Sequence, residues 1–140
     1  MSLWLALNEH HAGLDSAFAL RAGADSEVRR LLEATLRDAD AALLVCEGET
    51  GLAGFCSVRV DRAPRIMVET QRAEITELIV SPGQRRRGIG RALVEDCLSW
   101  LAERGLARCE IRVAADNAEG GSFWRALGFD PWMDVLQRRL

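Results

Sequence analysis

Residues 81–91, with the sequence SPGQRRRGIGR, separate two different hydrophobic patterns. The run before them, residues 73–80, is apolar and rich in β-branched side chains, as in a strand. The residues that follow, 92–104, repeat apolar side chains at helical spacing. The sequence therefore predicts a strand, a turn rich in glycine and arginine, and a helix, in that order.

The composition of this turn is typical of a site that binds a pyrophosphate. The N-terminus of a helix exposes unpaired N–H groups and a partial positive charge, and glycines let that backbone approach a ligand closely. Arg85, Arg86 and Arg87 add fixed charge and fork-shaped donors. The turn lacks the Gly-Lys-Ser/Thr ending of nucleotide triphosphatases and the first glycine of the dinucleotide-binding fingerprint. Taken alone, the pattern Arg85-x-x-Gly88-x-Gly90 is equally typical of an exposed basic turn that merely begins a helix.

Composition and length place the chain among soluble globular proteins. A length of 140 residues predicts one domain that spans residues 1–140, and 49% apolar with 28% charged residues is ordinary for that class. A net charge of -3 does not favour nucleic-acid binding, and no apolar run reaches the roughly 18 residues of a membrane span. The four cysteines have neither a C-x-x-C pair nor a metal-like spacing with the two histidines. We therefore expect no metal site, and buried thiols in the reducing cytoplasm.

The rest of the chain predicts a mixed α/β protein, because helical and strand patterns alternate along it. The expected helices lie at residues 1–12, 25–37, 88–104 and 117–127, and the expected strands at residues 41–47, 52–60, 73–80, 108–114 and 134–140. Residues 48–51 predict a hairpin turn and residues 14–24 a loop. His10 and His11 are interpreted as surface residues, or residues with satisfied hydrogen bonds, rather than as ligands or catalytic groups.

Two motifs of the chain resemble those of the GNAT superfamily of N-acetyltransferases. Residues 74–91 are similar to the family's central strand, its Q/R-x-x-G-x-G/A turn and the helix that follows. Residues 111–113, Asn117 and the run FWRALGF at 123–129 are similar to the family's penultimate strand and its Asn…Phe-Tyr-x-x-x-Gly-Phe helix. The resemblance covers roughly residues 41–140. It implies a mostly antiparallel central sheet with one splayed parallel pair of strands, flanked by helices.

The resemblance also implies acetyl-CoA as a cosubstrate and an amine as the acceptor. The pyrophosphate would lie on the backbone amides of residues 85–90, and the pantetheine arm would enter the gap beside Ile79 and Val80. A backbone N–H there would polarise the thioester carbonyl while the amine attacks it directly. The cofactor-binding residues that the resemblance implies are Ile79, Val80, Arg85, Arg86, Arg87, Gly88, Ile89, Gly90, Arg91, Asn117 and Trp124.

Two carboxylates of the central strand are candidates for the catalytic base that deprotonates the amine. Glu74 falls where a base of the family lies, whereas Glu77 is nearer the thioester and is expected on the opposite face of the strand. The alternatives are that each is an ordinary solvated strand residue, or that a base acts only through water. Together with Asp61 and Glu69, these carboxylates would make the acceptor region acidic, which favours a cationic amine of a small molecule or a peptide.

Two departures from the family's pattern leave alternatives open. Members of the family often use a tyrosine to protonate the departing thiolate, but the chain contains no tyrosine. Trp124 stands in the matching place, where it packs against CoA or only against the core. A catalytically silent acyl-CoA-binding module is therefore the alternative to an active enzyme. Many members also begin with a strand that is missing here, so either the sheet lacks that edge strand or another chain supplies it. The exposed sheet edge and the apolar Trp4 favour a homodimer.

Overall fold

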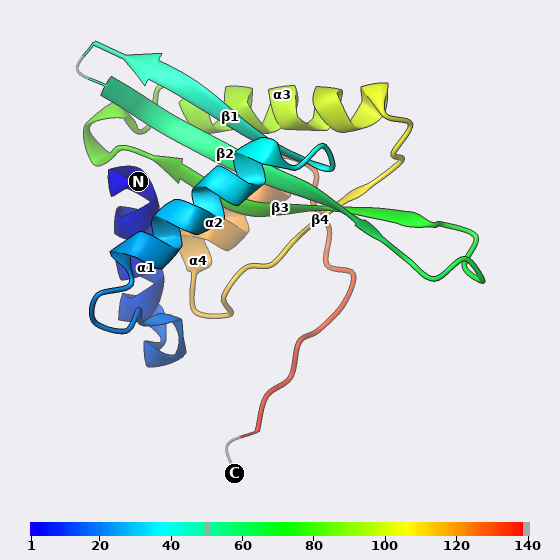
Figure 1. The fold of residues 1–140 in the computed structure, drawn as a ribbon, viewed down its shortest axis with the longest axis horizontal. Coiled ribbons are helices and arrows are strands. Elements are labelled where there is room, and N and C mark those ends of the chain that lie inside the picture. Colours follow the sequence, from blue (N-terminus) through cyan, green and yellow to red (C-terminus); the bar gives the residue numbers. More distant parts are fainter. Residues whose placement is uncertain (50, 139–140) are drawn as a thin grey trace.

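Four strands form one sheet, with helices on both of its faces, in residues 1–49 and 51–138, which this computed structural model describes (Figure 1). The strands are β1 (Ala41–Gly48), β2 (Gly51–Arg62), β3 (Gln71–Val80) and β4 (Cys109–Ile111). The helices are α1 (Ser2–Leu14), α2 (Asp25–Arg37), α3 (Ile89–Glu103) and α4 (Ala118–Ala126), with the short 3-10 helices η1 (Ser16–Phe18) and η2 (Pro82–Gln84). None of these helices is both long enough and apolar enough to cross a membrane.

The strands lie in the order β1-β2-β3-β4, and the last pair differs from the others. β1 with β2 and β2 with β3 are antiparallel, whereas β4 runs parallel to β3 after the chain has crossed over through α3. The parallel pairing is short, because it joins only residues 73–75 of β3 to residues 109–111 of β4. Beyond Ile75, β3 continues to Val80 with no described strand beside it on that side. The predicted antiparallel sheet with a splayed parallel pair is thus confirmed.

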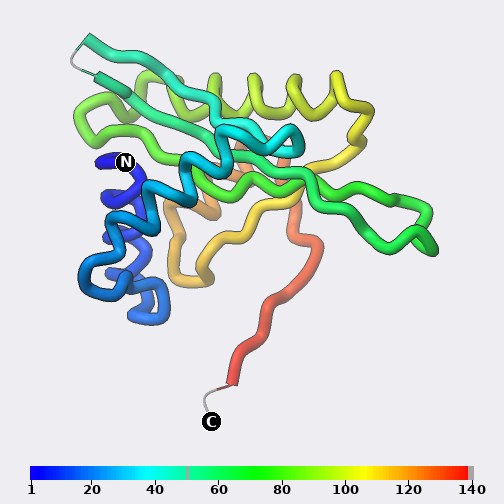
Figure 2. The backbone as a smooth tube through the Cα atoms, in the orientation of Figure 1, coloured from blue at the N-terminus to red at the C-terminus, as the bar shows by residue number. Residues whose placement is uncertain are grey.

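The hydrophobic core lies between the sheet and α3. Val94, Cys97 and Leu101 recur at helical spacing, so that one stripe of α3 faces the strands. Alternate strand residues meet this stripe. The buried cluster consists of Cys56, Val58, Val60, Ala73, Ile75, Leu93, Val94, Cys97, Leu101 and Trp124. All four cysteines are free thiols. The opposite face of the sheet carries α1 and α2, and α2 crosses in front of the strands (Figure 2).

β3 contains one extra residue relative to β2. The neighbouring β2 residues 57 and 58 pair with Glu77 and Ile75, so Thr76 between them is a bulge residue without a partner. An inserted residue reverses the alternation of faces for everything after it. Glu74 and Glu77 therefore lie on the same face of the sheet, the one that α1 and α2 cover. The expectation that they face opposite ways is wrong, because simple alternation does not account for the bulge.

The end of the chain departs from the predicted topology. A strand is expected at residues 134–140, but residues 130–138 form no helix or strand, and residues 139–140 lie outside the described part. Val135 and Leu136 are 80% and 91% exposed. A strand forms only where its N–H and C=O groups meet another edge. This segment instead runs away from the sheet (Figure 1), so no partner stabilises it as a strand.

The other predicted elements are confirmed, with shifted ends. α1 extends to Leu14, and the predicted loop at residues 14–24 contains η1. β4 is shorter than the predicted strand at 108–114, because its pairing with β3 ends at Ile111. The predicted hairpin turn includes Thr50, which lies outside the described residues.

Replacing Ile75 by alanine tests the position of the core. Ile75 is 1% exposed and belongs to the cluster beneath α3, so the substitution leaves a cavity. We expect the free energy of unfolding, measured by urea denaturation, to fall by about 2–5 kcal/mol. Val135→Ala is the control, because the Val135 side chain is 80% exposed and its loss should change that free energy by less than about 0.5 kcal/mol. Equal losses in the two variants would contradict the assigned core.

Candidate functional site

The turn between β3 and α3 leaves a row of main-chain donors free. Arg86 and Gly88 have positive φ values of 62° and 82°, and α3 begins directly after Gly88. None of the six N–H groups of residues 86–91 donates to a backbone carbonyl of the described residues. Unpaired donors of a helix N-terminus, next to backbone turned into the left-handed region, form a concave surface that favours an anion.

A cleft of about 650 Å³ begins at this turn and runs into the gap between β3 and β4. Its walls come from residues 76–80 of β3, residues 111–114 at the end of β4, the turn itself, α4 and the C-terminal half of α1. Because α1 lies on one face of the sheet and the Trp124 side chain of α4 packs into the core on the other, residues from both faces line the cleft.

The main chain of β3 offers hydrogen-bonding groups along this cleft. The Ser81 N–H donates to the Ala53 carbonyl of β2 at 2.8 Å. Main-chain groups of successive strand residues point to opposite edges. Val80 and Leu78 therefore direct their N–H and C=O groups away from β2, toward the side on which β4 has separated. An extended ligand can pair with this edge as another strand would.

The cleft brings together most of the predicted cofactor-binding residues. It is lined by Ile79, Val80, Arg85, Arg86, Gly88, Ile89, Gly90, Arg91, Asn117 and Trp124. Arg85 donates from Nε to the Val80 carbonyl at 3.2 Å, which holds its guanidinium at the mouth of the cleft. Arg87 is not among the lining residues, and its Nη1 donates instead to Oε1 of Gln84 at 3.1 Å.

α4 supplies another wall of the cleft. Asn117 caps the helix, because its side-chain oxygen accepts a hydrogen bond from the Gly120 N–H at 2.9 Å. Trp124 is 8% exposed and contacts Phe123 and Phe129 edge-on, with ring centroids 5.2 Å and 5.1 Å away. Trp124 thus belongs to the core and lines the cleft at the same time.

The Glu74 carboxylate is held by two arginines. Its Oε2 lies 2.7 Å from Arg59 Nη2, its Oε1 lies 3.2 Å from Arg112 Nε, and Arg59 also pairs with Asp61. Glu74 does not line the cleft. Glu69 is likewise paired, with Arg108. The acidic character that the sequence predicts for this region is therefore offset by arginines at three of its four carboxylates, and both oxygens of Glu74 are already engaged.

Glu77 is the predicted carboxylate that does line the cleft. The Thr76 hydroxyl donates a hydrogen bond to Glu77 Oε2, so the bulge residue helps to hold the Glu77 carboxylate in place. Leu7, His10 and His11 of α1 line the same cleft, on the face of the sheet toward which Glu77 projects. Two histidines of α1 and one carboxylate of β3 therefore line the same cleft.

His11 is the functional candidate that sequence reasoning missed. It is half-buried, and its ring lies 5.7 Å from the Phe18 ring and 5.8 Å from the His10 ring. Burial, followed by repulsion from His10, lowers the pKa of His11 below its usual value, because both disfavour the charged imidazole. The helical spacing from Leu7 to His11 was visible in the sequence, but not what that face of the helix meets.

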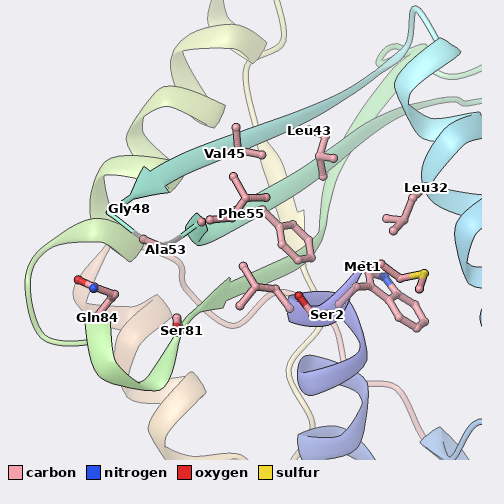
Figure 3. A pocket seen from close by; sticks show the side chains of 14 residues that line it. Met1, Ser2, Leu32, Leu43, Val45, Gly48, Ala53, Phe55, Ser81 and Gln84 are labelled. Atoms are coloured by element: carbon pink, nitrogen blue, oxygen red, sulfur yellow. The ribbon is translucent and has the colours of Figure 1, made fainter.

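In the described residues, neither a second depression nor a metal-binding cluster offers competing chemistry. A second depression, of about 400 Å³, lies between the start of α1, α2 and the β1–β2 pair (Figure 3). Its lining is mostly aliphatic and aromatic, with Leu32, Leu43 and Phe55 on its walls, and includes no acidic, basic, histidine or cysteine side chain. No group of three or more His, Cys, Asp or Glu side chains in residues 1–49 and 51–138 is arranged to hold a metal ion.

Comparison with known proteins agrees with this geometry. The sequence pattern of the acetyltransferase (GNAT) family matches residues 7–129. A mycothiol acetyltransferase of Clavibacter michiganensis subsp. michiganensis is 37% identical over 98 residues, which are 69% of this chain and 29% of that protein. The chain therefore spans less than a third of that relative's length.

Two solved structures share the fold. The BH1408 protein from Bacillus halodurans, solved as a tetramutant, superposes with a TM-score of 0.86 at 20% identity, over 99% of this chain and 90% of that one. A predicted acetyltransferase from Clostridium acetobutylicum, solved with acetyl-CoA, gives a TM-score of 0.76 at 15% identity, over 99% and 88% of the two chains. Since the family's pattern covers most of the sequence and the fold agrees, this chain belongs to the acetyltransferase (GNAT) family.

Proposed function

We propose that this chain is an enzyme that transfers the acetyl group of acetyl-CoA to a primary amine. The observation that carries the proposal is one cleft that joins two features, the free N–H groups of residues 86–91 and the edge of β3 that no described strand pairs with. The first suits a diphosphate and the second suits an extended arm that carries amide groups. Acetyl-CoA has both parts in that order, and family membership supports the same ligand.

In this proposal the chain's own residues hold the cosubstrate by main-chain contacts and fixed charge. The pyrophosphate lies on the N–H groups of residues 86–91, with Arg85 and Arg86 beside it. The pantetheine arm follows the edge of β3, so that the thioester carbonyl meets the N–H of Leu78 or Val80. Such a donor stabilises the negative charge that develops on this oxygen when the amine attacks.

The acceptor amine enters from the α1 side, where Glu77 lies. A carboxylate at this position attracts an ammonium group and orients it toward the thioester. We propose that Glu77 rather than Glu74 has this role, because both oxygens of Glu74 are engaged by Arg59 and Arg112. The proposed acceptor is a cationic amine of a small molecule or a peptide.

The absence of tyrosine favours one competing function, a catalytically silent acyl-CoA-binding module. In the active enzyme, the Trp124 N–H can donate a hydrogen bond to the departing thiolate but cannot protonate it. A thiolate is a good leaving group near neutral pH, so an additional acid is not obligatory. The silent module instead binds acetyl-CoA in the same cleft without turnover.

A thiol-release assay separates the two functions. Acetyl-CoA is incubated with the protein and with spermidine, glucosamine, an aminoglycoside or a peptide with a free N-terminal alanine, while calorimetry measures acetyl-CoA binding. Amine-dependent release of CoA supports the enzyme. Binding without release across all four amine classes supports the module, and no binding of acetyl-CoA contradicts both.

We also propose a single domain that works in the cytoplasm and forms a homodimer. The four free thiols support a reducing compartment, because disulfides are rare there. β1 is an edge strand of the sheet, and its Val45 side chain is 47% exposed, which supports pairing with another chain. Sedimentation at several protein concentrations would measure the oligomeric state.

Arg85→Ala and Arg87→Ala form a matched pair that tests the phosphate site. Only Arg85 lines the cleft, although both arginines belong to the same turn. A hydrogen bond to a charged group contributes about 1.5–3 kcal/mol, so we expect Arg85→Ala to weaken acetyl-CoA binding roughly tenfold or more. Arg87→Ala should leave the dissociation constant within about twofold of the wild type. A larger effect of Arg87→Ala in calorimetry would contradict the assigned path of the diphosphate.

Glu77→Gln and Glu74→Gln distinguish the two carboxylates. Glu77→Gln removes the charge at the cleft, so kcat/KM for the amine should fall on the order of tenfold while acetyl-CoA affinity is unchanged. Glu74→Gln should mainly lower the free energy of unfolding, by up to about 1 kcal/mol, because its arginine partners are largely exposed. If Glu74→Gln lowered kcat/KM more than Glu77→Gln did, Glu74 rather than Glu77 would be the residue that attracts the amine.

A further inference from the structure

The α1 end of the cleft contains a group that the proposed function does not use. His11 and Glu77 line the same cleft from two different elements, α1 and β3. We infer that His11 is the general base that takes the proton from the acceptor ammonium before the amine attacks. This inference rests on the proposed acetyl transfer and names the residue that prepares the nucleophile for it.

The position of His11 is fixed by the segment that follows α1. η1 folds back onto α1, where the Asn8 side chain donates to the Phe18 carbonyl at 3.1 Å. Asp15 supports this turn, because its side chain accepts from the Ala17 N–H at 2.9 Å. Phe18 thereby covers one side of the His11 ring, with centroids 5.7 Å apart. The imidazole is therefore held in a half-buried place beside the cleft rather than free in solvent.

The charges around His11 suit a base more than an acid. The charged or titratable groups on the elements around His11 are His10 on α1, Asp15 before η1, Arg59 on β2, Glu74 and Glu77 on β3, Arg85, Arg86 and Arg91 at the turn and the start of α3, Arg112 after β4 and Glu119 on α4. Arg59 and Arg112 are paired with Glu74, so the carboxylates in the cleft wall are those of Glu77 on β3 and Glu119 on α4. Burial lowers the pKa of His11, so the neutral imidazole, which can accept a proton, predominates at neutral pH.

The proton balance of the reaction is complete with this assignment. One proton leaves the ammonium for the free ring nitrogen of His11, and Glu77 holds the amine in place. The amine nitrogen then attacks the thioester carbon, the C–S bond breaks, and the second proton of the nitrogen goes to the departing thiolate. His11 returns its proton to solvent through the open cleft. The sum is one amide, one CoA thiol and one released proton.

Glutamine substitutions of the two histidines give a matched test on the same helix. Using the best amine of the panel above, we expect His11→Gln to lower kcat/KM about a hundredfold at pH 7. The wild-type kcat/KM should rise with pH through the pKa of His11, which burial places below its usual value, and this rise should be absent in His11→Gln. His10→Gln should keep this rise, moved to slightly higher pH because the repulsion from His10 is lost. Unfolding midpoints of the two variants check that neither effect comes from lost stability. A His11→Gln enzyme with the wild-type pH profile would overturn the inference.

A second measurement does not depend on turnover. The chain has only two histidines, so His10→Gln leaves His11 as the single imidazole for NMR titration. Its pKa should still lie below the usual value, since burial is the larger cause, and its ring signals should shift when acetyl-CoA binds. An imidazole that titrates normally and does not respond to acetyl-CoA would refute the base assignment. If the wild-type protein released no CoA with any amine, the acetyl-transfer proposal would fail instead.

Discussion

The site depends on the point at which β3 loses its strand partner. Backbone N–H and C=O groups that are removed from water need partners, and in a continuous sheet the neighbouring strand supplies them. Here β4 stops pairing after Ile111, so the outer edge of β3 remains open from residue 76 to residue 80. The gap, the main-chain donors beside it and access from α1 all follow from this early separation. A longer parallel pair would give a more regular sheet and no cleft.

The bulge at Thr76 adds a second constraint, because it decides what the strand presents on each side. Before the bulge, Glu74 forms ion pairs with Arg59 and Arg112. After it, Glu77 lies on the same face but at the cleft, with the Thr76 hydroxyl bonded to it. One inserted residue thus separates a carboxylate that forms ion pairs from one that lines the cleft.

The strand, turn and helix around residues 81–91 could be predicted because glycine, arginine and hydrophobic period are local properties. With the second motif at residues 111–129, the arrangement of the sheet and most of the cofactor-binding residues that line the cleft could be predicted as well. The bulge at Thr76 could not be predicted, because the alternation of side chains along a strand does not reveal where a residue is inserted. The pairing of Glu74 depends on arginines far away in the sequence, and the placement of His11 depends on where α1 docks. The predicted final strand was wrong because a strand requires a partner edge, which sequence pattern does not reveal.

Two parts of α3 lie in different surroundings. Its N-terminus lies at the turn beside the cleft, and its apolar stripe packs into the core. A ligand that organises the first therefore also favours the packing of the second, and binding becomes thermodynamically linked to folding. A coenzyme present at a hundred times its dissociation constant would stabilise the native state by about 2.7 kcal/mol. The lifetime of the protein against unfolding and proteolysis would then rise and fall with the supply of the proposed cosubstrate.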